Sequence, residues 1–291
     1  MTAARKQAKK TITPAKPFTD PEHSSTGSVE VVRSVTKKMQ SPSAADGKPT
    51  TSRDVRTKTY VAPTTVVTTT VGELLNGVRP IPEQQQERLG ITGAGGSGAK
   101  LWIAGDASLL KRPCVAIVGA RKVSREGAAR ARRLARELAQ AGVVVVSGLA
   151  KGVDTEALGS AIDAGGKTIA VIGTPITKAY PAENKRLQER IYREHLLISQ
   201  FAPGKVVFRS NFPERNKLMA AITDATVIVE ASDTSGSLHQ AAECVRLGRW
   251  LFIAKSLAEN PSLRWPKDFV QYPNTRILNE TSDILDLIRV N

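Results

Sequence analysis

The feature that most constrains the fold is an alternation of short apolar runs with helical patterns from Cys114 onward. The runs are rich in β-branched residues, and between them apolar residues recur every three or four positions. Such alternation is typical of a parallel sheet whose strands are joined by crossover helices. We therefore predict a doubly wound, mostly parallel α/β domain of the extended Rossmann-like type. Its strands are predicted at Cys114–Val118, Val143–Ser147, Lys167–Ile172, Leu196–Ser199, Ala225–Glu230 and Trp250–Ala254.

The stretches between these runs predict the helices. In the first of them, alanines and leucines fall on one helical face and arginines on the other, so the helix packs by its alanine-rich side; the arginines are Arg125, Arg132, Arg133 and Arg136. Four further helices are predicted at Asp154–Ala164, Glu183–Glu194, Phe212–Ile222 and Gly236–Leu247. The segment Leu101–Leu110 is expected to lead into the first strand.

The composition changes upstream of this domain. Residues 1–70 are rich in Thr, Ser, Lys, Ala and Pro and poor in large hydrophobic residues, so burial cannot repay their ordering entropy. We expect a disordered basic tail over 1–70, a short helix around Glu83–Leu89 with a Gly-rich linker over 71–100, and the Rossmann-like domain over 101–291. The formal net charge of +15, which the tail shares, favours a polyanion as partner.

Cysteine content and hydropathy exclude several classes of protein. Cys114 lies in an apolar run and Cys244 in a helical pattern, so neither a disulfide framework nor a zinc cluster is expected. No apolar run approaches the roughly 20 residues of a membrane span, and no apolar signal core follows the basic N-terminus. We expect a cytoplasmic protein with no membrane partner and no metal.

Two nucleotide-binding patterns lack the necessary context. Gly93, Gly95 and Gly98 have the dinucleotide spacing, but no strand precedes them and no long helix follows. Gly166-Lys167-Thr168 resembles the end of a phosphate-binding loop, yet Ala161 occupies the place of its first glycine and the order of helix and strand is reversed. We therefore predict no cofactor and no ATP hydrolysis by this motif.

Two predicted strand-to-helix turns carry glycines and cations where the carboxyl ends of parallel strands form a ligand crevice. Glycine lets the backbone approach a ligand and expose its amides, and Arg or Lys adds a charge suited to phosphate. The residues expected to bind phosphate here are Gly119, Arg121, Lys122, Ser147, Gly148, Lys151 and Gly152.

Two later segments complete the predicted crevice. Ser235, Gly236 and Ser237 open a helix, and their hydroxyls and amides either hold phosphate or only cap that helix. A second segment surrounds one aromatic residue with cations and amides, a mixture that contacts phosphates while stacking a base. It contains Arg209, Asn211, Phe212, Arg215, Asn216 and Lys217, and Phe212 is alternatively a core anchor or an N-terminal staple.

Taken together, these segments resemble the DprA/Smf family and, more broadly, the nucleotide-binding Rossmann superfamily that includes the LOG hydrolases. The resemblance covers roughly residues 85–291 and runs through Leu101–Leu110, Val115–Arg121, Val145–Asp154, Ile169–Gly173, Tyr180–Asn184, Asn211–Lys217 and Ser235–Leu238. It implies a domain that binds single-stranded DNA, passes it to a RecA-type recombinase without a chemical step, and forms a homodimer.

The resemblance also assigns roles to single residues. It implies that Arg121 grips phosphate and Phe212 stacks on a base, and that the strand's path is lined by Arg209, Arg215 and Lys217. Asn211 and Asn216 are expected to hold their loop, and Asp154 to order the Ser147–Gly152 turn. The helical and winged-helix modules of many family members are not recognisable here, and Asp233-Thr234 and His239–Glu243 depart from the commonest form, which favours a divergent or mobile-element member.

Two other functions share parts of this pattern. A LOG-like N-glycosidase needs the glutamate of a Gly-Thr-x-x-Glu frame, but here the frame starts at Gly236 and places the neutral amide of Gln240 there. An amide cannot act as general acid or base, and His239 has no visible partner, so we predict that the chain is not an enzyme. A nucleotide- or signal-sensing domain without hydrolase activity stays open as the alternative.

Overall fold

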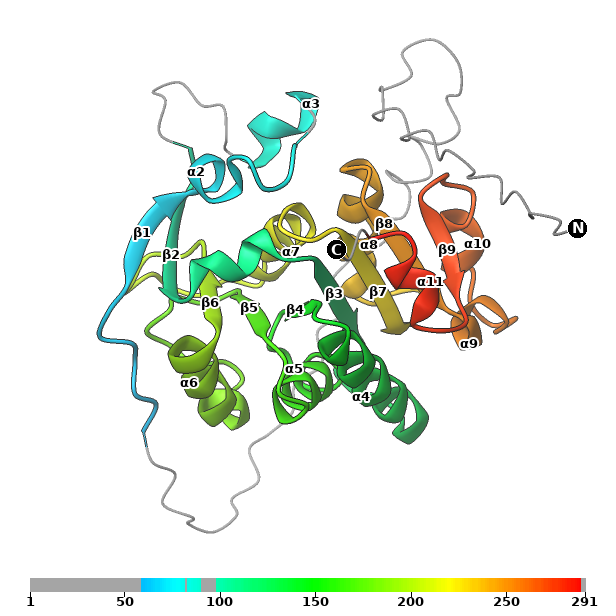
Figure 1. Cartoon of the computed structure of the whole chain (residues 1–291), viewed down its shortest axis with the longest axis horizontal. Helices are drawn as coiled ribbons and strands as arrows, with labels where there is room; N and C mark the ends of the chain where they lie inside the picture. The colour runs from blue at the N-terminus through cyan, green and yellow to red at the C-terminus, as the bar shows by residue number, and fades with distance from the viewer. Residues whose placement is uncertain (1–58, 82, 90–97, 289–291) are drawn as a thin grey trace, which may run out of the picture.

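The computed structural model describes residues 59–81, 83–89 and 98–288. Within them, nine strands form one sheet of order β1-β2-β6-β5-β4-β3-β7-β8-β9 (Figure 1). The strands are β1 Val67–Thr70, β2 Lys100–Gly105, β3 Cys114–Gly119, β4 Val144–Ser147, β5 Thr168–Ile172, β6 Leu196–Ser199, β7 Ala225–Glu230, β8 Trp250–Ala254 and β9 Thr275–Leu278. Most of the tail expected over 1–70 and most of the Gly-rich linker lie outside the described residues.

The sheet is mixed but mostly parallel. All neighbours from β6 through β9 pair in parallel, with Val115 opposite Val145 on β4 and opposite Ala225 on β7. Only β2 on β6 and β1 on β2 are antiparallel. The predicted doubly wound α/β fold is confirmed.

Helices cover both faces of the sheet (Figure 1). One face carries α4 (Arg125–Gln140), α5 (Val153–Asp163), α6 (Lys185–Glu194) and α11 (Ser282–Leu285), and the other carries α7 (Asn211–Ala221), α8 (Ser237–Arg246), α9 (Lys255–Ala258) and α10 (Trp265–Phe269). The short helices α2 (Val71–Leu75) and α3 (Glu83–Gln86) precede them. None of the described helices is long and apolar enough to cross a membrane.

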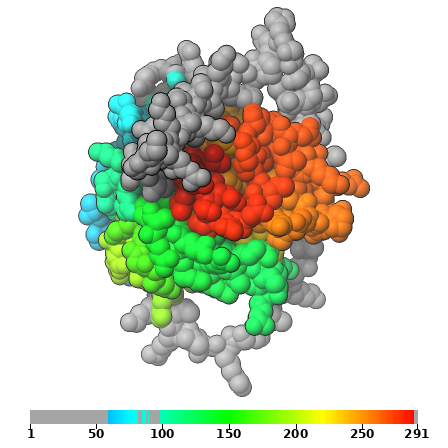
Figure 2. All heavy atoms as spheres, turned by 45° about the vertical axis from the view of Figure 1, so that its right-hand side comes forward, coloured from blue at the N-terminus to red at the C-terminus, as the bar shows by residue number. Residues whose placement is uncertain are grey.

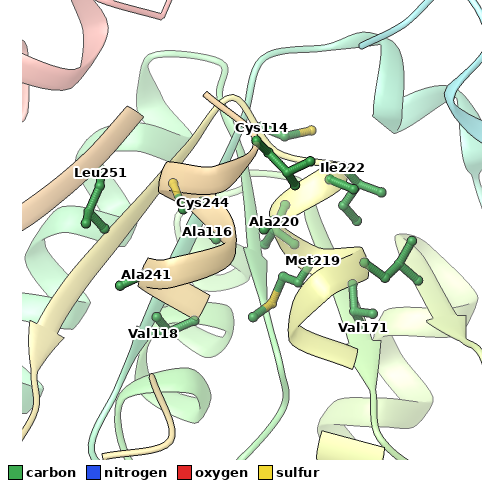
Figure 3. Close-up of a cluster of buried hydrophobic side chains, with 14 of the residues drawn as sticks. Cys114, Ala116, Val118, Val171, Met219, Ala220, Ile222, Ala241, Cys244 and Leu251 are labelled. Atoms are coloured by element: carbon green, nitrogen blue, oxygen red, sulfur yellow. The ribbon is translucent and has the colours of Figure 1, made fainter. Parts of the chain in front are cut away.

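The longest described helix shows why the sequence folds in this way. Ser124 caps α4 by accepting a hydrogen bond from the amide of Gly127 at 2.9 Å. The predicted alanine and leucine stripe, including Ala131 and Leu138, is fully buried against the sheet. On the opposite face of the sheet, Met219 of α7, Ile222 directly after α7, and Ala241 and Cys244 of α8 pack over the strands (Figure 3). The C-terminal segment lies against the elements of the green part of the chain (Figure 2), and the Thr281 hydroxyl donates to Glu137 of α4.

The start of the domain differs from the prediction. Val67–Thr70, assigned to the tail, form β1, and Leu101–Leu110 forms most of β2 and a 3-10 helix. The Tyr60 hydroxyl also donates to the carbonyl of Ile176 and accepts from Gln188. Thr and Val are good strand formers, and an edge strand needs few large apolar residues, so an average over 70 residues concealed this strand. The prediction for 1–70 is therefore wrong at its C-terminal end.

Candidate nucleic-acid interface

A crevice of about 1070 Å³ opens where the winding of the sheet reverses, between β3 and β7. From β3 the chain runs through β4, β5 and β6 in one direction, whereas β7, β8 and β9 lie on the other side. The crossover helices leave β3 and β7 on opposite faces, so the loops after these strands separate and leave a crevice at their carboxyl ends. Its walls come from the turns after β3, β4, β7 and β8 and from the start of α7.

The structure divides the predicted site residues into two groups. Those lining the crevice are Gly119, Arg121, Lys122, Arg209, Phe212, Arg215, Asn216, Ser235, Gly236 and Ser237. Those that do not line it are Ser147, Gly148, Lys151, Gly152, Asn211 and Lys217. The first strand turn, the start of α7 and the start of α8 therefore converge as expected, and the second strand turn supports them from behind.

The turn after β3 presents two exposed cations, Arg121 and Lys122. The Arg121 guanidinium lies over the ring of Phe212, 5.5 Å from its centroid. Gly119 is required at this point because a Cβ atom would come within 2.7 Å of both the Glu230 carbonyl and Val153. The side chain of Arg121 thus reaches from the first strand turn to the aromatic residue of α7.

A carboxylate already occupies the N-terminus of α4. Glu230, at the end of β7, accepts hydrogen bonds from the amide of Ser124 at 2.9 Å and from its hydroxyl at 2.5 Å. Arg130 lies 3.7 Å from the same carboxylate. In many Rossmann domains this helix end receives a pyrophosphate. In this chain the carboxylate of Glu230 occupies that helix end instead. Glu230 and Ser124 are 106 positions apart, and no sequence pattern revealed this contact.

The second strand turn is internally closed. Asp154 accepts hydrogen bonds from the amides of Gly148 at 3.0 Å and Ala150 at 3.3 Å, which confirms its predicted ordering role. Burial raises the pKa of Asp154, while the nearby Arg215 cation and these amides act in the opposite direction. The buried Ser147 hydroxyl donates to the Ile117 carbonyl. The structure therefore places Ser147 and Gly148 in the scaffold of the crevice.

The two other residues of this turn are also held within the protein. Gly152 has φ +77°, and a Cβ atom there would come within 2.3 Å of the Ala120 carbonyl. Lys151 is exposed but pairs with Glu183 at 2.6 Å. In α7, Lys217 likewise pairs with Glu214 at 2.9 Å.

Arg215 takes a different place from the one predicted. Its side chain is buried, and Nη1 donates to the carbonyls of Gly148 and Val171, both at 2.5 Å. Desolvation lowers the pKa of Arg215 to about 10. The guanidinium forms the floor of the crevice and is not an exposed part of the strand's path. A signal was present, because Arg215 shares the apolar helical face of Leu218, Met219 and Ile222.

The two asparagines hold the loop as predicted. The side-chain amide of Asn211 donates to the Gly173 carbonyl at 3.3 Å, and that of Asn216 donates to the Gly236 carbonyl at 3.3 Å. Asn216 also accepts from the Nε of Arg215 at 3.0 Å. These contacts tie the start of α7 to the loop after β5 and to the start of α8.

Two aromatic rings lie together in the crevice. Phe212 is half-buried, and its ring centroid lies 5.6 Å from that of Tyr180, which is 47% exposed. A Cβ atom on Gly173 would come within 2.7 Å of the Phe212 ring, so this glycine gives the ring its space. Sequence reasoning assigned no role to Tyr180, although it follows β5 at the carboxyl edge of the sheet.

The start of α8 has hydroxyls that face each other. The Ser235 and Ser237 hydroxyl oxygens are 2.7 Å apart, and no side chain caps the helix in the usual way. Gln240 is buried, and its amide donates to the Asn216 carbonyl at 2.7 Å and accepts from the Thr226 hydroxyl at 3.1 Å. Gln240 thus bridges α7, α8 and β7. Burial lowers the pKa of His239, which is half-buried in the crevice wall.

A model of the family described as DNA recombination-mediator protein A matches residues 92–289, which is more than half of the chain. The chain belongs to this family. The DNA processing protein DprA of Streptococcus pneumoniae is 42% identical over 152 residues, covering 52% of this chain and 54% of the relative. DprA of Bacillus subtilis is 32% identical over 174 residues, covering 60% and 59%. The chain thus spans little more than half the length of these curated relatives.

Solved structures agree with the fold. The crystal structure of S. pneumoniae DprA superposes with a TM-score of 0.59 at 33% identity and covers 67% of this chain and 69% of that chain. DNA processing protein A of Helicobacter pylori, studied for its single-stranded DNA binding mode, superposes with a TM-score of 0.59 at 26% identity and covers 71% and 92%. In the described part of this chain, no three His, Cys, Asp or Glu side chains converge as a metal site would require.

Proposed function

We propose that this protein binds single-stranded DNA in the crevice between β3 and β7 and acts as a recombination mediator. One observation carries the proposal. The crevice combines the exposed cations Arg121, Lys122 and Arg209 with the neighbouring rings of Tyr180 and Phe212. Cations that follow a backbone, together with aromatic rings on which bases stack, are the usual equipment of single-strand binding proteins.

A small-nucleotide sensor is the rival function for the same crevice. Its phosphates would need free amides at the helix N-termini. Glu230 binds the Ser124 amide before α4, and Asp154 binds the amides of the turn before α5. The start of α8 is left, and it offers the two hydroxyls of Ser235 and Ser237. Such a site suits one phosphate of a strand better than the several charges of a pyrophosphate.

The proposal extends to partners and location. Membership of the recombination-mediator family supports delivery of the bound strand to a RecA-type recombinase, homodimer formation and a cytoplasmic location. The buried amide of Gln240 supports a role without hydrolysis, because an amide cannot transfer protons as a glutamate does. The H. pylori relative and its single-stranded DNA binding mode support the choice of ligand.

Fluorescence anisotropy tests the proposal directly. Labelled single-stranded and duplex oligonucleotides of equal length are titrated with the protein, and calorimetry measures binding of free mononucleotides and dinucleotides. We expect the single strand to bind at least tenfold more tightly than the duplex, because stacking needs unpaired bases. Arg121→Ala should weaken single-strand binding, whereas Arg133→Ala, which changes an exposed arginine paired with Glu137 on α4, is the matched control. Equal affinity for both DNAs, or tighter binding of a free nucleotide, refutes the proposal.

A further inference from the structure

The loop between β6 and α7 exposes two apolar side chains beside the crevice. Val206 is 68% exposed and Phe208 is 61% exposed, more than any other large apolar side chain in the described part of the chain. Neither belongs to a buried core cluster or lines the crevice. The backbone from 205 to 208 forms no helix or strand. One exposed apolar residue needs no explanation, but an exposed phenylalanine next to a strand-binding crevice has a clear chemical use.

Phe208 is held close to the crevice by the start of α7. Its carbonyl accepts a hydrogen bond from the backbone amide of Asn211 at 3.1 Å, and the Arg209 carbonyl accepts one from the backbone amide of Phe212 at 3.3 Å. The next residue, Arg209, lines the crevice. Phe208 therefore lies at the rim of the crevice. It precedes the lining residue Arg209 by one position and Phe212 by four.

The charge around this ring selects the partner. Lys205 and Arg209 are both exposed, and neither forms an ion pair with any residue that the structure describes. The rim segment thus carries an exposed aromatic ring with an exposed cation on either side of it in the sequence. A polyanion with planar groups complements this combination, whereas an apolar protein surface would leave both cations desolvated.

We propose that Phe208 is a second stacking platform, which takes an unpaired base of the same DNA strand just outside the crevice while Lys205 and Arg209 contact the flanking phosphates. This rests on the proposed function and extends the strand's path beyond the crevice. Bases inside the crevice meet Tyr180 and Phe212, and the next base along the strand meets Phe208.

Oligonucleotide length separates the two platforms. Anisotropy competition measures the affinity of unlabelled oligothymidylates of about six nucleotides, near the lower end of the site sizes of single-strand binding folds, and of about twenty, beyond their upper end. Phe208→Ala should lower the affinity for the long strand about tenfold. It should change the affinity for the short strand, which fits the crevice, by less than about twofold. Phe212→Ala should lower both affinities. Phe208→Trp should restore the long-strand affinity and Phe208→Leu should not, because leucine has no π-face.

Matched controls and opposing outcomes complete the test. Ile277→Ala removes an exposed apolar side chain of β9 and should leave both affinities unchanged. The inference is overturned if Phe208→Ala leaves long-strand affinity unchanged, weakens both lengths equally, or lowers the mass measured by light scattering, which would make the rim a contact between two copies. If the parent protein binds neither length, the proposed function itself has failed.

Discussion

Replacing Arg215 by methionine tests whether this arginine supports the crevice from below. Methionine keeps an unbranched stem but has no guanidinium, so the change removes the charge and the hydrogen bonds together with the packing of that planar group. The parent side chain is 6% exposed and donates to the carbonyls of Gly148 and Val171. Arg215→Met leaves both carbonyls without these donors and removes a cation near the buried Asp154.

The expected loss follows from these contacts. A buried acceptor left without its partner costs about 1–3 kcal/mol. Two such acceptors give about 2–6 kcal/mol, and Asp154 also loses a nearby cation that favours its charged form. We therefore expect Arg215→Met to lower the free energy of unfolding by about 3–5 kcal/mol. For a domain of this size, the melting temperature should fall by about 6–20 °C. The stability of Arg215→Lys should lie between those of the parent and Arg215→Met, because lysine keeps the charge but lacks the planar guanidinium.

The pH dependence gives a second readout. The pKa of Asp154 in the folded protein is already raised by burial, and loss of Arg215 raises it further. Such a carboxyl does not lower the free energy of unfolding at pH values below its unfolded-state pKa of about 3.9. It lowers it by the full amount at pH values above its folded-state pKa. The stability deficit of Arg215→Met should therefore be smallest in acid, where Asp154 is protonated in every state, and should grow as the pH rises.

The assay is thermal and urea unfolding followed by circular dichroism, with Arg209→Met as the matched control on an exposed arginine. The control should change the free energy of unfolding by less than about 0.5 kcal/mol. An Arg215→Met protein as stable as the parent, with a shallower salt dependence of DNA binding, would make Arg215 a phosphate ligand and refute this account.

Three further outcomes follow from the structure. When the logarithm of DNA affinity is plotted against the logarithm of salt concentration, Arg121→Ala should make the slope shallower by about 0.7. Phe212→Ala should weaken the binding free energy by about 1–3 kcal/mol and leave the slope unchanged. Equal slopes for both variants would contradict the assigned roles. Gly173→Ala, which crowds the Phe212 ring, should weaken binding in the same assay while circular dichroism shows a folded domain. Deleting residues 1–58 should leave the melting temperature nearly unchanged and make binding less salt-dependent, whereas deleting 1–70 should lower it, since β1 is lost; equal melting temperatures would show that β1 adds no stability.

The sheet was predictable because its strands are buried on both faces. Runs such as Leu196–Ser199, Ala225–Glu230 and Trp250–Ala254 begin and end where predicted. Edge strands lack that signal. β9 is four residues long and partly exposed, with a charged Arg276, and it was not predicted. Strand prediction thus succeeded where burial sets a continuous apolar pattern and failed where one edge faces solvent.

The site was predictable as a set of turns, because parallel strands bring their carboxyl ends to one edge. Which side chains face the ligand was not. Glu230 reaches Ser124 across 106 positions, and Arg215 lies beneath the crevice, because pairing between distant elements decides both. Tyr180 and Phe208 carried no pattern of their own, since exposure of a loop residue follows from the packing of its neighbours.

Photo-cross-linking shows which side chains the bound strand contacts. A single-stranded oligonucleotide carrying 5-iododeoxyuridine is irradiated in complex with the protein, and the cross-linked peptides are mapped by mass spectrometry. We expect cross-links at the crevice rings Tyr180 and Phe212, and we expect them to be lost when unlabelled single strand competes. Cross-links confined to the outer face of α4, with none at the crevice, would contradict it.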